Sequence, residues 1–275
     1  MATRATLGKA PRAPRTAVPL AAYVLHRYDW SESSLILDLF TREQGRIAVA
    51  AKGAKRPYSQ LRGVLLPFQR LNISLGRAAA TDEAASEVQT LRGAEWAGGA
   101  AMLTGAALFS GFYVNELLMK LVARHDPHAA LFDAYAYTLP ELAADDDTQV
   151  QAALRAFELV LLRETGLLPD LSLMTLTQQP VRAQERYALL PEAGVGAARD
   201  DDAIDGAALV GLQAALEHGS LAALHQACRP CLAALKVLLR GMIQQQLGSG
   251  VLRTRQVMTE LQSLAPIRSA MSELR

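Results

Sequence analysis

The sequence predicts an α+β protein in which a small β-barrel precedes an all-helical domain. Short segments rich in β-branched and aromatic residues occupy the first third of the 275-residue chain. From about residue 97 onward, apolar residues recur every three or four positions in Ala- and Leu-rich segments, as in amphipathic helices. The charge changes at the same place, because residues 1–95 carry a net charge of +6 and residues 96–275 a net charge of −5. Two domains with different partners are therefore expected.

Residues 1–17 are expected to form a disordered basic arm. They contain prolines and no apolar run of the kind that a secretory signal requires. No segment of the chain approaches the roughly 18 apolar residues that span a bilayer. The chain has two cysteines, fewer than a disulfide-dependent secreted protein of this size would usually carry. The sequence thus predicts a cytoplasmic protein with no membrane partner.

Five segments within residues 18–96 carry strand signals. Turn residues 29–33 separate the first two, and the Gly-containing connection 43–45 joins the second to the third as a hairpin. Pro67 cannot donate to a ladder, so the fourth strand is expected to lie at an edge or to contain a bulge. The expected strands are residues 21–28, 35–41, 46–51, 64–75 and 87–92. Five short strands in this length fit a small closed barrel, of which the OB-fold is one kind.

Residues 97–275 are predicted to form a helical domain with a small irregular module at about 171–205. Prolines and glycines interrupt the periodicity in the module, where one hairpin is expected near residues 187–190. Pro230 is expected to bend or break a later helix. The expected helices span residues 99–124, 128–143, 145–165, 207–218, 221–247 and 254–264, and the segment Asp145-Asp146-Asp147-Thr148 is expected to cap the third of them.

The sequence has no motif of a common enzyme active site. It lacks the P-loop, the dinucleotide-binding glycines, H-E-x-x-H and G-x-S-x-G, so no catalytic residue is proposed. His225, Cys228 and Cys231 are spaced by three and could share a helical face, with His218 as the nearest fourth metal ligand. Pro230 disturbs that face, and the alternative is a pair of buried helix thiols.

The strongest functional signal is electrostatic. Between Glu43 and Asp82 the chain has no acidic residue and seven basic ones, four of them within residues 52–62. Lys and Arg along a groove neutralise phosphates and release counterions, which drives sequence-independent binding. The rings of Tyr58, Tyr28 and Phe68 could offer faces on which unpaired bases stack. An ordinary solvated basic loop is the alternative. The candidate DNA-binding residues are Arg27, Arg46, Lys52, Lys55, Arg56, Tyr58, Arg62 and Arg70.

Several segments, in order along the chain, resemble bacterial RecO proteins. The first reads YVLHRYDWSESSLIL and a second reads FTREQGR, and the matches together run from about residue 20 to 170. They comprise residues 23–37, 40–46, 51–55, 63–68, 113–118 and 155–162.

This resemblance implies an N-terminal OB domain and a role in the RecFOR recombination pathway. RecO proteins bind single- and double-stranded DNA, anneal strands coated with single-strand binding protein, and work with RecR to load the RecA recombinase. Some relatives hold zinc through four cysteines in the module after the third helix. Residues 171–205 contain no cysteine here, so neither zinc nor another cofactor is expected.

The resemblance also implies that the helical domain captures the acidic C-terminal tail of single-strand binding protein, which ends in Phe. Arg155, Leu159 and Leu162 lie at i, i+4 and i+7, so they are expected to offer a cation and an apolar surface on one face. Lys120 and Arg124, one turn apart, are expected to add charge. The alternative is that Arg155 is a surface arginine whose stem covers the core.

Two functions from other classes stay open at this point. One is an RNA-binding OB protein of translation, which a barrel alone does not distinguish from a DNA-binding one. The other is a nucleic-acid-processing enzyme, against which the lack of carboxylate clusters in the basic segment argues.

Overall fold

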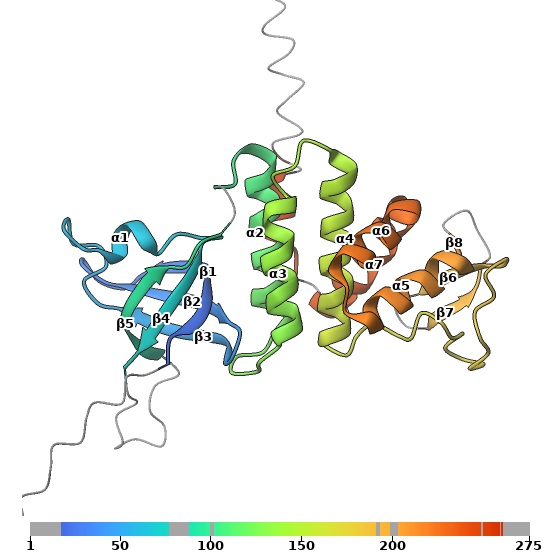
Figure 1. Cartoon of the computed structure of the whole chain (residues 1–275), viewed down its shortest axis with the longest axis horizontal. Helices are drawn as coiled ribbons and strands as arrows, with labels where there is room; N and C mark the ends of the chain where they lie inside the picture. The colour runs from blue at the N-terminus through green and yellow to red at the C-terminus, as the bar shows by residue number, and fades with distance from the viewer. Residues whose placement is uncertain are drawn as a thin grey trace, which may run out of the picture.

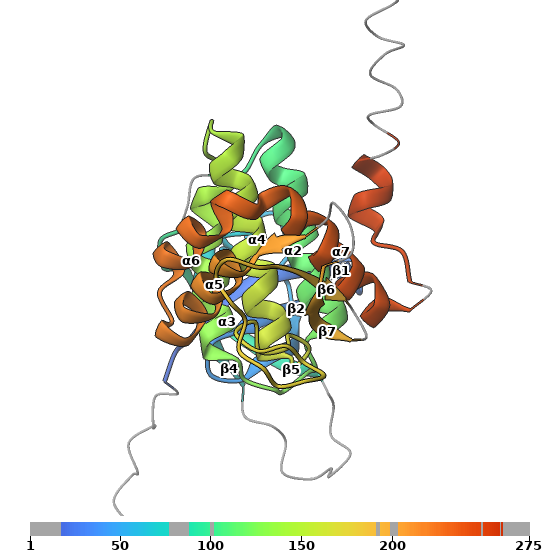
Figure 2. The same cartoon turned by 90° about the vertical axis from the view of Figure 1, so that its right-hand side faces the viewer.

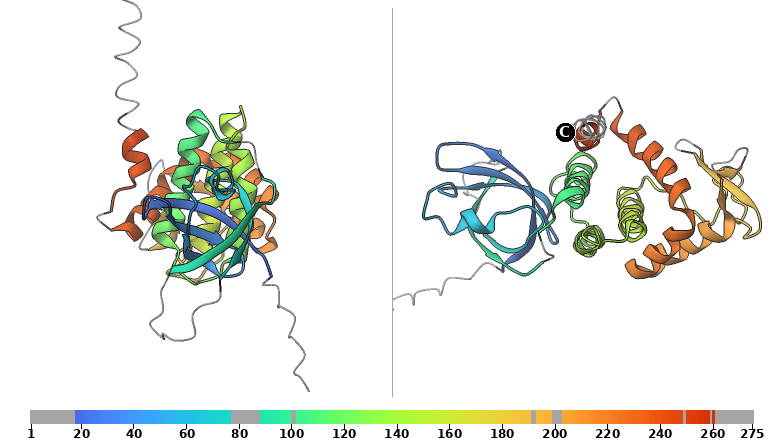
Figure 3. Two further views of the ribbon diagram at one scale, coloured as in Figure 1. Left: turned by 90° about the vertical axis from the view of Figure 1, so that its left-hand side faces the viewer. Right: turned by 90° about the horizontal axis from the view of Figure 1, so that it is seen from above.

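The computed structural model describes residues 18–76, 88–99, 102–190, 193–198, 203–248, 250–258 and 260. Figure 1 shows a barrel, a central group of helices and a last group that carries a small sheet. The view from above in Figure 3 shows that these three parts follow one another along the long axis, and Figure 2 looks along that axis from the end with the small sheet. The expected arm at residues 1–17 lies outside the described residues, as does Arg77 of the acid-free window.

The first part is a closed five-stranded barrel, which confirms the OB-type prediction. Its strands run in the order β1-β2-β3-β5-β4, with β3 and β5 parallel and the other pairs antiparallel. A short helix, α1 (Leu61–Val64), lies between β3 and β4 in the chain. The strands are β1 (Leu20–Asp29), β2 (Leu35–Thr41), β3 (Gly45–Ala51), β4 (Arg70–Leu75) and β5 (Val88–Trp96). Apolar side chains such as Val24, Leu37 and Ile47 fill the interior.

The predicted strand at 64–75 is wrong in its first half. Residues 61–64 are helical, and the strand begins only at Arg70. Phe68 has a φ of 67° and is buried against the helical domain. A Cβ on Gly111 would lie 2.9 Å from the Phe68 ring, so the glycine makes room for it. Packing against another domain thus overrides the local strand signal.

The helical domain is organised around its third long helix, α4 (Asp147–Glu164), in which every residue from 152 to 162 is buried. The Asp146 carboxylate accepts a hydrogen bond from the Thr148 N–H, which confirms the expected N-terminal cap. Pro230 breaks the predicted 221–247 helix into two through a 3-10 turn. The other elements are α2 (Gly105–Leu121), α3 (Ala129–Glu141), α5 (Gly206–His218), α6 (Leu221–Cys228), η1 (Arg229–Cys231) and α7 (Leu232–Leu247). None of these helices has the length and apolarity needed to cross a bilayer.

The module at 171–205 is more regular than expected. The predicted hairpin is present as β6 (Arg186–Leu190) and β7 (Gly194–Ala197). A third strand, β8 (Ile204–Asp205), pairs with the other side of β6. Two residues are too few to carry a periodic signal, so this strand was not foreseeable. Residues 253–258 are helical, which covers the start of the helix predicted at 254–264. Most of the rest of that predicted helix lies outside the described residues.

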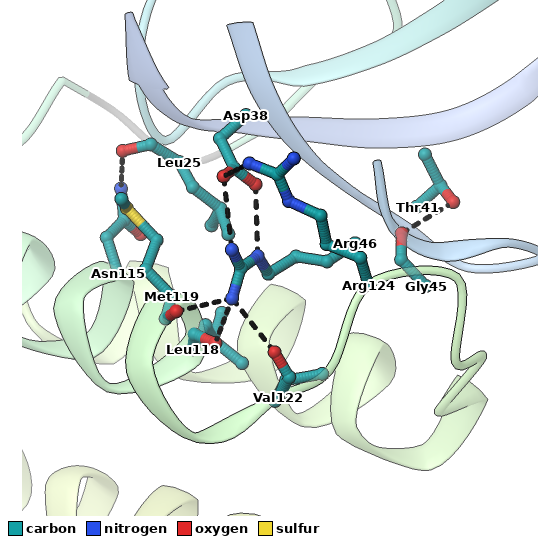
Figure 4. A network of polar contacts seen from close by, with 10 residues as sticks. All are labelled: Leu25, Asp38, Thr41, Gly45, Arg46, Asn115, Leu118, Met119, Val122 and Arg124. Atoms are coloured by element: carbon teal, nitrogen blue, oxygen red, sulfur yellow. Dashed lines mark hydrogen bonds and ion pairs between the residues drawn. The ribbon is translucent and has the colours of Figure 1, made fainter. Parts of the chain in front are cut away.

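A buried ion pair joins the barrel to the helices. Arg46 on β3 meets both carboxylate oxygens of Asp38 on β2, with its Nε 3.1 Å from Oδ1 and its Nη2 3.2 Å from Oδ2. Its Nη1 donates to the carbonyls of Leu118, Met119 and Val122 at the end of α2 (Figure 4). The Arg124 guanidinium also reaches Asp38, at 3.3 Å. The guanidinium of Arg46 thereby caps the C-terminal carbonyls of α2.

The stability of the domain contact should depend on this pair. Replacing Arg46 by Ala leaves Asp38, whose side chain is 2% exposed, without its main cation. We expect the free energy of unfolding to fall by about 3–5 kcal/mol, as measured by urea denaturation. Arg42→Ala is the control, because Arg42 also links the barrel to α3, through Asp133, but at the surface. Little change is expected there. Equal losses in the two variants would contradict the assignment.

Candidate functional site

A cleft of about 420 Å³ opens at one end of the barrel. Its floor is apolar, and Arg27, Lys55 and Arg62 lie around it together with Asp29. These cations come from β1, the loop after β3, and α1. We call this feature the barrel cleft. It brings together three of the residues predicted from the acid-free window and its neighbourhood.

A bulge in β1 directs Arg27 into the barrel cleft. The pairing of β1 with β2 shifts between Val24 and His26, so Leu25 is an extra residue. Val24 faces the barrel interior before the bulge, and Arg27, paired with Leu37, is on the interior side after it. The Arg27 guanidinium donates to the Leu65 carbonyl at 3.3 Å.

The loop after β3 carries most of the other predicted DNA-binding residues at the surface. Lys55 Nζ lies 2.9 Å from Asp29 Oδ1, an exposed pair that a phosphate could replace. Gly53 has a φ of 72°, a backbone conformation that residues with a side chain rarely adopt. The residues fully at the surface are Lys52, Arg56, Tyr58 and Arg62. Tyr58 is 96% exposed, which suits a stacking platform.

Two of the predicted DNA-binding residues lie elsewhere. Arg46 is wrong as a phosphate contact, because its guanidinium is buried and bonded to Asp38 and the α2 carbonyls. Arg70 is exposed on β4, where it lies opposite Tyr23 of β1 in the strand pairing, and it does not line the barrel cleft. Sequence alone showed the charge of these residues and not their partners.

A second cavity, of about 220 Å³, lies in the helical domain. Arg155 of α4, Lys236 and Arg240 of α7, and Arg255 from the end of the described chain line it. Apolar side chains such as Leu154, Ile243, Leu252 and Met258 complete the wall. Among the described residues that line it, none is acidic. We call it the cationic pocket.

Arg155 is held in the cationic pocket by a buried carboxylate. Its Nη2 lies 2.8 Å from Glu158 Oε1, which also accepts a hydrogen bond from the Tyr113 hydroxyl at 2.7 Å. Burial raises the pKa of Glu158, and the nearby Arg155 opposes that rise. The Arg155 side chain is 8% exposed, and its Nε has no hydrogen-bond partner within the described part of the chain. A buried donor of this kind is costly unless a ligand satisfies it.

The other residues predicted for peptide binding are placed differently. Leu159 and Leu162 are wrong as pocket walls, because both are fully buried in the core around α4. Lys120 contacts Glu116 and the Val251 carbonyl, and Arg124 contacts Asp38, so neither lines the cationic pocket. Sequence reasoning missed Lys236 and Arg240. Their i, i+4 spacing on a helix of an acidic domain was the available signal.

The cysteines are packed as helix thiols. Cys228 is fully buried, and Cys231 Sγ lies 3.7 Å from the Ala227 carbonyl. Burial raises the pKa of Cys228 strongly and raises that of Cys231 to about 11. No group of three His, Cys, Asp or Glu side chains suited to a metal occurs among the residues that the structure describes.

Comparisons with known proteins agree with this arrangement. Residues 18–97 match a family model described as recombination protein O N terminal, and residues 102–256 match one described as recombination protein O C terminal. The chain is 51% identical over 246 residues to a DNA repair protein RecO of a Polaromonas species, covering 88% of this chain and 96% of that protein. It is 52% identical over 249 residues to a DNA repair protein RecO of Verminephrobacter eiseniae, with the same coverage.

The thiols should react slowly in the folded protein. At pH 8 a pKa near 11 leaves only about one Cys231 in a thousand as the reactive thiolate. We expect slow labelling of Cys231 by a disulfide reagent, faster as the pH rises toward 11, and labelling of Cys228 only after unfolding. Protein denatured in urea is the control, in which both thiols should react at the ordinary rate. Rapid labelling of both in folded protein at pH 7 would disprove this assignment.

Proposed function

The chain belongs to the RecO family of DNA repair and recombination proteins, and from this premise we propose a specific role for it as a recombination mediator. It binds single- and double-stranded DNA, anneals complementary strands, and with RecR helps load RecA onto DNA coated with single-strand binding protein. The observation that supports this most directly is the barrel cleft, where Arg27, Lys55 and Arg62 converge.

The chemistry of the barrel cleft suits a binder without sequence preference. Phosphate contacts by Lys and Arg fix a nucleic acid in place and carry no sequence information. A mediator that anneals any two complementary strands needs such a surface, because it has to act on whatever sequence is exposed. The surrounding residues Lys52, Arg56 and Tyr58 extend the contact along the loop after β3.

The cationic pocket suits the acidic tail of single-strand binding protein. Leu154, Ile243 and Leu252 provide an apolar surface for the terminal Phe ring. Arg155 lines the pocket and supplies a positive charge for the terminal carboxylate, while Lys236 and Arg240 can meet the acidic residues before it. Because the rest of this half of the chain is acidic, attraction to such a tail has to be local.

The two sites together account for mediation without catalysis. They lie on different domains, so the protein can hold single-strand binding protein by its tail while the barrel takes the strand that is released. The protein is cytoplasmic in this proposal, and it needs no zinc, because residues 171–205 contain no cysteine.

DNA binding should lose salt dependence when loop cations are removed. Lys55→Ala combined with Arg56→Ala should weaken binding to all sequences and reduce the log–log salt slope on single strands by about 0.7 per lost contact. Fluorescence anisotropy over a salt series measures both effects. Arg182→Ala with Arg186→Ala, which removes two exposed cations from the module, is the matched control. An unchanged slope in the loop variant would exclude this loop from the DNA-binding surface.

The same variants in a strand-annealing assay, with and without single-strand binding protein, test the proposed activity.

Peptide binding should depend on the cationic pocket and not on the barrel. Lys236→Ala with Arg240→Ala should weaken binding of an acidic peptide ending in Phe by at least about tenfold, since hydrogen bonds to charged groups are lost. Calorimetry measures this, and binding to naked DNA should stay nearly intact. Arg155→Ala should weaken binding of the same peptide by about 1.5–3 kcal/mol. It should also destabilise the fold, because Glu158 loses its counterion. Wild-type peptide affinity in the double variant, or an equal loss of DNA binding, would rule out the pocket.

A further inference from the structure

A third cavity, of about 590 Å³, lies between the barrel and the helical domain. Its walls are the outer side of β1, the exposed side of α2, and residues 253–257 near the end of the described chain. Seen from above in Figure 3, this red C-terminal segment lies beside α2. We call this cavity the junction groove. Its functional side chains are His26, Tyr28, Phe109, Phe112, Lys120 and Arg253.

The junction groove exposes aromatic rings that a folded protein would ordinarily bury. Tyr28 is 43% exposed and Phe112 is 38% exposed. Neighbouring rings hold both in place, because His26 meets Tyr28 edge-on with centroids 4.4 Å apart and Phe68 meets Phe112 at 5.3 Å. Fixed, partly exposed rings are the arrangement on which unpaired bases stack.

The junction groove is continuous with the barrel cleft through one strand. Successive residues of a strand point to opposite sides, so after the bulge at Leu25 the side chains of His26 and Tyr28 face α2. Arg27 and Asp29, between and beyond them, line the barrel cleft. The edge of β1 therefore carries a phosphate-binding cation on one side and base-stacking rings on the other.

The charge of the junction groove also suits a nucleic acid. Its charged lining residues are Lys120, Arg253 and Glu116, which give a net charge of +1. The Glu116 carboxylate is occupied, because it accepts hydrogen bonds from the backbone N–H groups of Arg253 and Thr254, at 2.8 Å and 3.0 Å, and from the Thr254 hydroxyl. Lys120 lies 3.8 Å from it. The net positive charge therefore favours an anionic strand at this groove.

We propose that the junction groove receives unpaired nucleobases of the strand whose phosphates lie at the barrel cleft. This inference rests on the proposed DNA-binding function and deepens it. Only single-stranded DNA can offer its bases in this way, because a duplex keeps them stacked and paired. The groove would thus give a preference for single strands that phosphate contacts alone do not provide.

The test separates base contacts from phosphate contacts. Tyr28→Leu and Phe112→Leu each remove a ring and keep an apolar side chain. We expect each to weaken binding of a single-stranded oligonucleotide by at least about fivefold, the lower end for one stacked base. Binding of an abasic oligonucleotide of equal length, and the salt slope on either DNA, should stay at the wild-type value. The quenching of a 2-aminopurine base by the wild-type protein should diminish in the same variants.

Tyr137→Leu is the matched control, because Tyr137 is 38% exposed on α3 and lines a different cavity. It should leave all these values unchanged, and circular dichroism should show every variant folded. Wild-type affinity for base-containing DNA in both ring variants would overturn the proposal, and so would equal losses on abasic DNA. Loss of acidic-peptide binding with DNA binding unchanged would make the groove a peptide site instead. If the wild-type protein binds neither oligonucleotide, it is the proposed DNA-binding function that fails.

Discussion

The arrangement of the two domains depends on one buried guanidinium. Arg46 extends from the barrel, neutralises Asp38 and donates to three carbonyls at the end of α2, so four acceptor groups share one cation (Figure 4). Beside it, a Cβ on Gly45 would lie 2.0 Å from the Asp126 carbonyl oxygen, which only glycine tolerates there. Such a contact is directional, unlike the packing of Tyr23 and Phe40 on α3. The contact of Arg46 with α2 therefore fixes the position of β1 relative to α2. These two elements form walls of the junction groove.

Much of the fold could be predicted because its signals are local. Each of these signals depends only on residues close together in the chain. They are the strand and helix periods, the Asp146 cap and the break at Pro230. The chain's charge pattern likewise located the loop after β3. It failed at Arg46 because the acid-free window begins after Glu43, whereas the partner Asp38 lies eight residues before Arg46 on the neighbouring strand. A charge count along the chain cannot detect a pair that forms across a hairpin.

The candidate sites were less predictable because they combine distant segments. Arg155, Leu159 and Leu162 do lie on a helix, as the sequence predicted. Other elements surround α4 on nearly every side, however, so Leu159 and Leu162 are buried in the core and do not line a surface pocket. The cationic pocket forms only when α7 and residues 252–258 come to Arg155. Similarly, which side chains of β1 face α2 is decided by one extra residue at Leu25, and the sequence there carries no turn or glycine signal.

The segment after α7 has a particular place in this structure because two cavities share it. Thr254 lines both the cationic pocket and the junction groove, with Met258 facing the first and Val257 the second. Glu116 fixes the segment by accepting hydrogen bonds from Thr254. Partial burial raises the pKa of the Glu116 carboxyl, but these hydrogen bonds and the charge of Lys120 outweigh that effect and lower the pKa below its ordinary value. The carboxylate thus stays ionised and satisfies N–H groups at the start of the helical turn. Any ligand that displaced this turn from one cavity would change the wall of the other. The cationic pocket and the junction groove are therefore connected at Glu116, near the C-terminal end of α2 that Arg46 also holds.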